Sequence, residues 1–158
     1  MAKNEIATNH KELIVWQLCH QLRSLTLKFT RNNKDDLRWR SQIRASIRSA
    51  CNNASEGFYR KRDGDFLNHL IFALASLGEF EDQLDEGLSA GAFTQVQHGE
   101  MKWLVIRAWR ANSALRRYLA ESIAKEKARK KAAREKEKEL RRLQREAASA
   151  RRPRPPRT

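Results

Sequence analysis

The stretch that decides the fold reads RSQIRASIRSACNNASEG and occupies residues 40–57. Small and apolar residues recur in it at three- and four-residue steps, which predicts a helix with one buried edge: Ile43, Ile47, Ala50 and Ala54. A neighbouring edge carries three arginines, each four residues from the next: Arg40, Arg44 and Arg48. A helix that packs on one side and presents a row of guanidinium groups on another is suited to holding an acidic partner.

Charge is distributed unevenly along the 158 residues. The chain carries 33 Lys and Arg against 19 Asp and Glu, a formal net charge of +14. Residues 1–124 contribute a net +4, whereas residues 125–158 hold 15 basic and 5 acidic residues, a net +10. The length allows one domain with a hydrophobic core. The excess of positive charge favours a polyanionic partner, with nucleic acid as the first choice and an anionic membrane surface as the second.

Cysteine content and hydropathy predict a soluble cytoplasmic protein. Cys19 and Cys51 each lie in an apolar helical pattern, which indicates buried reduced thiols rather than a disulfide framework or a zinc site. The sequence does not start with the apolar run of a signal peptide, and no stretch approaches the 18 apolar residues of a membrane span. We therefore expect no membrane partner.

Hydrophobic periodicity predicts four helices joined by short connections. The residues predicted to begin them are, in chain order, Thr8 or Asn9, Asp35 or Asp36, Asp63, and Thr94. The second helix runs to about Phe58 with Gly57 as its C-terminal glycine, and the third ends at a turn formed by Gly87, Gly91 and the residues between them. We predict an all-α fold, an antiparallel up-and-down four-helix bundle over residues 1–124.

The fourth predicted helix is apolar on more than one side. Its main stripe runs from Met101 to Leu119, but Trp103, Ile106 and Trp109 cannot all belong to that stripe. One interpretation is a wide core stripe with one half-exposed tryptophan. The other, which we favour, is an oligomer interface through which the protein associates with itself.

Residues 125–158 form a basic extension, predicted to be helical to about residue 148 and disordered beyond it. The helical part lacks an apolar face. Three acidic and basic pairs in it and just before it have the favourable four-residue spacing: Glu121/Lys125, Glu126/Lys130 and Glu137/Arg141. The last eight residues, RRPRPPRT, have the composition of a disordered segment.

Catalytic and metal-binding patterns are missing from the sequence. No glutamate has a histidine three residues later, which is the pattern of di-metal bundles, and the four histidines are scattered. P-loop, GxGxxG and nucleophile-elbow motifs are missing as well. We therefore predict a protein that is not an enzyme and that has no cofactor and no metal.

Basic residues remain as candidates for function, because binding to nucleic acid requires Lys and Arg that meet successive phosphates. The predicted nucleic-acid-binding residues are Arg40, Arg44, Arg48, Arg60, Lys61 and Arg62 in the second helix and the following turn, Arg107, Arg110, Arg116 and Arg117 in the fourth helix, and Lys130, Lys131, Arg141 and Arg142 in the extension. Two alternatives stay open. In the first, individual arginines pair with the acidic run at residues 79–86, within the bundle or across a subunit boundary. In the second, the extension only solubilises the protein.

Several segments together resemble a known family in their order and spacing. They are Val15-Trp16-Gln17, Gln42-Ile43-Arg44, Asn53-Ala54-Ser55-Glu56-Gly57-Phe58-Tyr59-Arg60 and Ala75-Ser76-Leu77-Gly78-Glu79. From about Lys11 to Ala120 the chain is similar to the small bacterial four-helix-bundle proteins encoded in intervening sequences of 23S ribosomal RNA genes. The same superfamily includes the accessory variability determinant of diversity-generating retroelements.

This resemblance implies a left-handed antiparallel bundle that assembles as a homopentamer and has no known catalytic activity. The retroelement members are basic, bind nucleic acid and dock on a reverse transcriptase, so the resemblance also implies that partner. It places Arg44 on the family's basic surface. Asn53 and Glu56 would be structural groups that fix the turn into the third helix.

The predicted function is therefore that of a non-enzymatic, homo-oligomeric bundle, pentameric by resemblance, that binds RNA or DNA. Its most specific version is an accessory subunit of a retroelement reverse transcriptase. The alternative is a protein–protein adaptor with a solubilising basic tail. A product of an rRNA insert with no function of its own is a third hypothesis.

Overall fold

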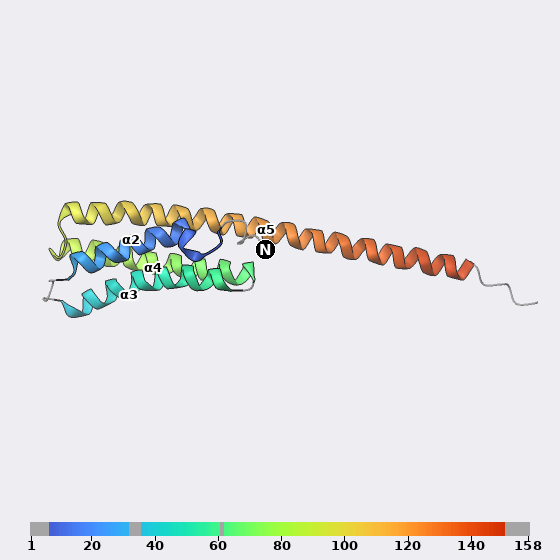
Figure 1. Cartoon of the computed structure of the whole chain (residues 1–158), viewed down its shortest axis with the longest axis horizontal. Coiled ribbons are helices and arrows are strands. Elements are labelled where there is room, and N and C mark those ends of the chain that lie inside the picture. The colour runs from blue at the N-terminus through green and yellow to red at the C-terminus, as the bar shows by residue number, and fades with distance from the viewer. Residues whose placement is uncertain (1–6, 32–35, 61, 151–158) are drawn as a thin grey trace, which may run out of the picture. The chain divides into compact units, whose positions relative to one another are not determined.

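Four helices pack against one another in an antiparallel bundle (Figure 1). The computed structural model describes residues 7–31, 36–60 and 62–150, with side chains described up to residue 148. Its elements are the 3-10 helix η1 His10–Glu12 and the α-helices α2 Ile14–Phe29, α3 Leu37–Tyr59, α4 Asp63–Ser89 and α5 Gln95–Ala150. No strand occurs among the described residues. The predicted all-α four-helix bundle is confirmed.

The chain divides into two compact units, Met1–Glu121 and Ser122–Thr158, and α5 contributes residues to both. The first unit contains the bundle. In the second, every described side chain from residue 124 to residue 148 is exposed. Two of the three predicted ion pairs are formed there, Glu126–Lys130 and Glu137–Arg141. The segment predicted to be disordered lies outside the described residues from residue 151 onward.

No helix within the described ranges combines the length and the apolar character that crossing a membrane requires.

Side-chain caps begin two of the four α-helices, α3 and α5, where the sequence predicts. The Asp36 carboxylate accepts a hydrogen bond from the backbone N–H of Trp39 at 2.8 Å. Thr94 and Gln97 form a reciprocal capping box at the start of α5. The first α-helix begins later than predicted, because Asn9 caps the short helix η1 instead. The cap of α4 is Arg62 rather than Asp63, which is the first residue of that helix and is buried.

Two glycines predicted to end helices lie inside them. At Gly57 an added Cβ would lie 2.5 Å from the Cβ of His69, and at Gly87 it would lie 2.3 Å from Cζ2 of Trp39. Both glycines therefore allow the close approach of a neighbouring side chain. Gly91 makes the turn after α4: its φ is +73°, and the N–H of Ala92 donates to the carbonyl of Gly87, as in a Schellman motif.

The hydrophobic core is built from the predicted stripes. Its largest fully buried side chains come from all four helices: Leu22 of α2, Ile43 and Ile47 of α3, Phe66, Leu70, Leu77, Phe80 and Leu84 of α4, and Met101, Leu104 and Leu119 of α5. Cys19 and Cys51 are buried free thiols, as predicted. Their mutual hydrogen bond, together with burial, raises the pKa of Cys19.

Polar groups in the core connect helices that are distant in sequence. The indole N–H of Trp39 donates to the carbonyl of Gln83 at 2.9 Å, which joins α3 to α4. The amide of Asn112 is fully buried within the α5 stripe and donates to the carbonyl of Leu70 at 3.0 Å. Burying these donors is tolerated because each finds an acceptor.

Candidate nucleic-acid interface

Four arginines of α2 and α3 form the α2–α3 basic face, which we define as Arg23, Arg40, Arg44 and Arg48. They line two hollows on the bundle surface. One has a volume of about 250 Å³ and is lined by Arg23, Arg44 and Arg48 together with Leu27 and Ile47. The other, of about 300 Å³, is lined by Arg40, Arg44 and Arg48 together with Leu37, Ser41 and Ala45. Because two arginines line both hollows, the face is continuous.

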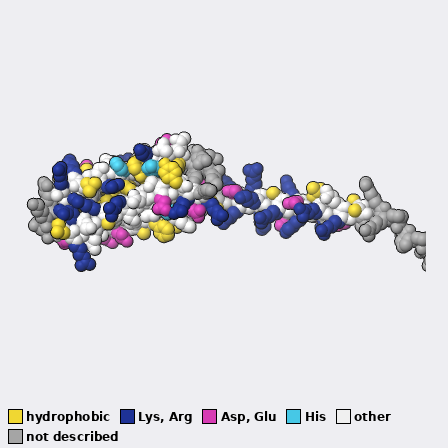
Figure 2. All heavy atoms as spheres, turned by 60° about the horizontal axis from the view of Figure 1, so that its bottom comes forward, with side chains coloured by type: hydrophobic (Ala, Val, Ile, Leu, Met, Phe, Trp, Pro, Cys, Tyr) yellow, Lys and Arg dark blue, Asp and Glu magenta, His cyan; other side chains and the backbone are white. Residues whose placement is uncertain are grey.

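Figure 2 looks toward the side of the bundle that α3 forms and shows Lys and Arg side chains gathered on it. The predicted row of arginines on α3 lies on one face, because Arg40, Arg44 and Arg48 line the same hollow. Arg23 of α2 is not among the predicted residues, because nothing in the pattern of α2 indicates which edge of that helix adjoins α3.

Arg44 is held in place by the end of α2. Its Nε donates to the hydroxyl of Thr30 at 2.8 Å, and Nη2 donates to the carbonyl of the same residue at 2.9 Å. The Thr30 hydroxyl donates in turn to the carbonyl of Thr26 at 2.6 Å. A guanidinium group has five N–H donors, so three donors of Arg44 remain for a ligand. The fold therefore orients this cation and keeps part of its binding capacity.

No ion pair with a described carboxylate engages Arg23, Arg44 or Arg48. The acidic run at residues 79–86 pairs instead with a lysine of α5. Lys102 Nζ lies 2.9 Å from both Glu81 Oε1 and Asp85 Oδ2. Burial opposes the charge on Lys102, but its hydrogen bonds to these two carboxylates outweigh burial and raise its pKa. Within one copy of the chain, α5 therefore neutralises part of the acidic run.

The four arginines of the predicted basic patch on α5 do not all lie on one face of that helix. The side chains of Arg107, Arg110 and Arg117 are exposed, and the guanidinium of Arg107 lies over the ring of Trp103, 4.4 Å from its centroid. Arg116 is different, because its Nε is buried without a hydrogen-bond partner among the described residues. It points away from the other three, as expected for residues 100° apart per position on a helix. Arg116 therefore does not share their face.

The turn between α3 and α4 contributes two described cations. Arg60 pairs with Glu56, and its Nε donates to Nε2 of His69 at 3.3 Å. Arg62 is exposed at the N-cap of α4. Lys61 lies outside the described residues.

In the extension, three of the four predicted residues form ion pairs along the helix. Lys130 pairs with Glu126, Arg141 pairs with Glu137, and Arg142 pairs with Glu139. Lys131 forms no ion pair with a described residue. Exposed pairs of this kind stabilise a helix by only about 0.3–0.5 kcal/mol, so phosphates can compete for these cations.

Trp103, Ile106 and Trp109 lie outside the core, with 57, 43 and 39% of their surfaces exposed. The interpretation of these residues as part of a wide core stripe is therefore wrong for this chain by itself. Large apolar side chains that are exposed at three-residue steps along one helix are typical of a surface that another protein covers.

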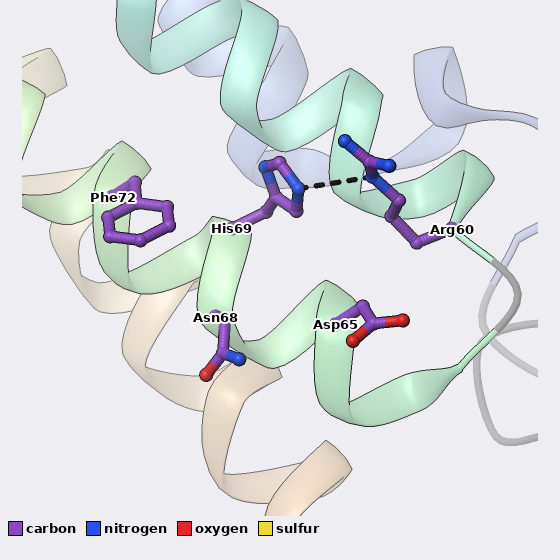
Figure 3. Close-up of a pocket in the computed structure, with 5 residues that line it drawn as sticks. All are labelled: Arg60, Asp65, Asn68, His69 and Phe72. Atoms are coloured by element: carbon purple, nitrogen blue, oxygen red, sulfur yellow. Dashed lines mark hydrogen bonds between the residues drawn. The ribbon is translucent and has the colours of Figure 1, made fainter.

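A further pocket lies beside the seam between α3 and α4 (Figure 3). Its volume is about 330 Å³, and its lining residues are Arg60 at the end of α3 and Asp65, Asn68, His69 and Phe72 of α4. None of the predicted site residues except Arg60 lines this pocket. The signal for it was Gly57, because only a residue without a side chain lets His69 pack against α3.

A chain of hydrogen bonds organises this pocket from α3. His69 Nε2 accepts from Arg60, so Nδ1 carries the proton and donates to the side-chain oxygen of Asn53 at 3.3 Å. Asn53 donates to the carbonyl of Ser49 at 3.0 Å. The prediction that Asn53 and Glu56 act as structural groups near the turn agrees with these contacts and with the ion pair between Glu56 and Arg60.

The fold and the site together define a class, the small all-α four-helix bundle with a basic face. The chain belongs to the 23S rRNA-intervening sequence protein family, whose model matches residues 11–114. No significant match was found among curated proteins. The matched region contains all four arginines of the α2–α3 basic face and the pocket beside α4.

Proposed function

We propose that this protein is a non-enzymatic, homo-oligomeric bundle that binds nucleic acid through its phosphates. The observation that carries the proposal is the α2–α3 basic face, where arginines from two helices line adjacent hollows and Arg44 is oriented by Thr30. Arginine forks suit phosphate oxygens, and a fixed guanidinium loses little side-chain freedom on binding. RNA and DNA share the phosphate chemistry, so the proposal covers both.

The basic extension supplies a second contact in this proposal. Residues 125–148 hold 11 Lys and Arg against 5 Asp and Glu, and all of their side chains are exposed. The electrostatic attraction between such a segment and a polyanion extends over about a Debye length, and it does not require the side chains to be held in a fixed geometry. It adds affinity to the face rather than sequence preference.

Self-association is the second part of the proposal, with Trp103, Ile106 and Trp109 in the interface. Their exposure in a single copy supports it, and the resemblance implies a pentamer. In a ring each basic face is repeated, and avidity raises the affinity for a long strand without new contacts. Docking on a reverse transcriptase is the finer version of the proposal and rests on the resemblance alone.

The test is the salt dependence of binding to a 20-nucleotide RNA, measured by fluorescence anisotropy. The double variant Arg23→Gln/Arg48→Gln removes two cations from the face. We expect it to reduce the slope of log K against log salt by about 1.4, because each lost phosphate contact on a single strand contributes about 0.7. The matched control is Arg38→Gln, which removes an exposed cation of α3 that lines neither hollow.

Absence of binding at low salt, or binding that does not respond to salt, would rule out this function. An effect of Arg38→Gln that is half that of the double face variant, and so equal per removed charge, would show that charge counts and the face does not. Light scattering on the full chain measures the oligomer directly, and Trp103→Ala/Trp109→Ala should reduce the mass to that of a smaller assembly.

A further inference from the structure

The pocket beside α4 has the composition of a site for a single nucleobase. We propose that it binds an unpaired guanine of a single-stranded nucleic acid. This inference rests on the proposed function and deepens it, because it adds a contact to a base where the α2–α3 basic face contacts phosphates. Its volume of about 330 Å³ is at the lower end of small-molecule pockets and suits one nucleoside rather than a larger ligand.

Phe72 provides the stacking surface. Phe72 is 56% exposed, which places a large apolar side chain at the surface. The imidazole of His69 stands at 90° to it, with ring centroids 6.1 Å apart, so the two rings form a corner. Aromatic side chains on a basic surface bind successive bases of a single strand by stacking on their faces. A flat base stacked on Phe72 would share the pocket with two polar side chains, Asp65 and Asn68.

Asp65 and Asn68 line the same pocket from the turns of α4 that precede Phe72, and they are the side chains available to read the edge of the base (Figure 3). Neither side chain forms a hydrogen bond or ion pair with another described residue. Guanine presents two adjacent N–H donors, at N1 and at the exocyclic amino group, and a carboxylate accepts both. The amide of Asn68 can donate to the neighbouring carbonyl oxygen of guanine. Adenine and cytosine offer one amino group at this edge, so guanine fits best.

Arg60 and His69 complete the pocket at its rim. The hydrogen bonds Arg60 to His69 and His69 to Asn53 fix both side chains against α3 before any ligand arrives. The guanidinium of Arg60 pairs with the exposed carboxylate of Glu56, and the phosphate attached to the bound nucleoside would compete with that carboxylate for it. The edge that Asp65 and Asn68 would read is paired in a duplex. The pocket therefore selects single strands.

The first test compares two 9-nucleotide oligouridines, one with a central guanosine and one with inosine at that position. Inosine lacks the exocyclic amino group and is otherwise the same base. We expect the full-length wild-type protein to bind the guanosine strand at least about fivefold more tightly, in the range of a lost specific base contact. Both measurements use the wild-type protein, so the comparison does not depend on whether a variant folds. Equal affinities would overturn the inference.

The second test assigns the discrimination to the pocket. In Asp65→Ala the two strands should bind equally, whereas in Asp82→Ala the preference for guanosine should persist. Asp82 is the matched control because it is an exposed carboxylate of the same helix that does not line the pocket. A preference that persists in Asp65→Ala would overturn the inference.

The third test concerns stacking. Phe72→Ala should reduce affinity for the guanosine strand about tenfold and leave affinity for a duplex of equal length unchanged, whereas Phe72→Trp should keep both. Equal losses for strand and duplex, or a smaller mass by light scattering, would show that the ring has another role, such as a contact between subunits. If the wild-type protein binds neither the 9-nucleotide strands nor the 20-nucleotide RNA at low salt, the proposed function itself fails. If it binds both 9-nucleotide strands with equal affinity, only the inference about guanine fails.

Discussion

Arg44 and Arg141 carry the same guanidinium group, but the regions around them hold it in different ways. Arg44 belongs to the bundle, and two hydrogen bonds to Thr30 tie it to the neighbouring helix. Arg141 belongs to the basic extension and pairs with Glu137 one turn earlier, with both side chains exposed. A charge fixed by tertiary contacts loses less entropy when it binds, whereas an exposed charge contributes by number and by long-range attraction. In the proposed function, the bundle provides geometry and the extension provides charge.

Removing the extension should produce the largest change. A chain ending at residue 124 loses 15 basic and 5 acidic residues, and we expect its affinity for RNA at about 50 mM salt to fall by about 100-fold or more. Its melting temperature should stay close to that of the full chain, because the bundle core lies within the first unit. Anisotropy and circular dichroism measure the two quantities. If affinity is retained, the extension serves solubility, and the α2–α3 basic face accounts for the binding by itself.

Disturbing the bundle without touching the extension should have the next largest effect. Gly87→Ala places a Cβ 2.3 Å from Trp39, and we expect it to lower the free energy of unfolding by about 2 kcal/mol. Gly78→Ala is the matched control on the same helix, since nothing lies within 4 Å of its added Cβ. It should stabilise the protein by up to about 1 kcal/mol, because alanine favours a helix more than glycine does. Urea denaturation distinguishes the two variants.

Replacing arginine by lysine tests the comparison itself, because the charge is kept and the fork is lost. Arg44→Lys should cost about 1 kcal/mol of stability, since lysine cannot make both hydrogen bonds to Thr30. Arg141→Lys should change stability by less than about 0.5 kcal/mol, as is usual for an exposed pair. Equal effects of the two substitutions in urea denaturation would show that the bundle does not fix its cations more firmly than the extension does.

The smallest predicted effect concerns pH. The hydrogen bond from His98, followed by that from Lys102, lowers the pKa of Asp85. A depressed carboxyl pKa adds stability above the unfolded-state value, and this stability is lost as the pH falls through the folded-state pKa. Asp85→Asn should therefore cost a few tenths of a kcal/mol at pH 6, and the difference from wild type should shrink toward pH 3. A cost that is the same at both pH values would exclude ionisation of Asp85 as its source.

Local signals in the sequence predicted most of the fold. The caps at Asp36 and Thr94 and the buried stripes follow from a helical period of 3.6 residues and from the orphan N–H groups at a helix start. The role of Gly57 was predicted wrongly, because a glycine near a helix end signals a terminus as well as a close contact. Only the position of His69 on the opposite helix distinguishes the two.

The candidate site was predicted in part. The sequence indicated the arginine row on α3, since residues four apart share a helix face. It did not reveal that Arg23 lines the same hollow or that Arg116 turns inward. Both depend on how α2 and α5 are rotated against their neighbours, and that rotation is decided by packing rather than by spacing.

By itself, the sequence determined four amphipathic helices, an antiparallel bundle and an excess of positive charge concentrated after residue 124. Periodicity, capping and charge are properties of neighbouring residues, so they can be read along the chain. The tertiary structure decided which cations are held and what lies beside them, as with Arg44 on Thr30 and the pocket of Asp65, Asn68 and Phe72. These partners belong to different helices or to successive turns of one helix face. Whether these side chains come into contact depends on the packing of the whole core.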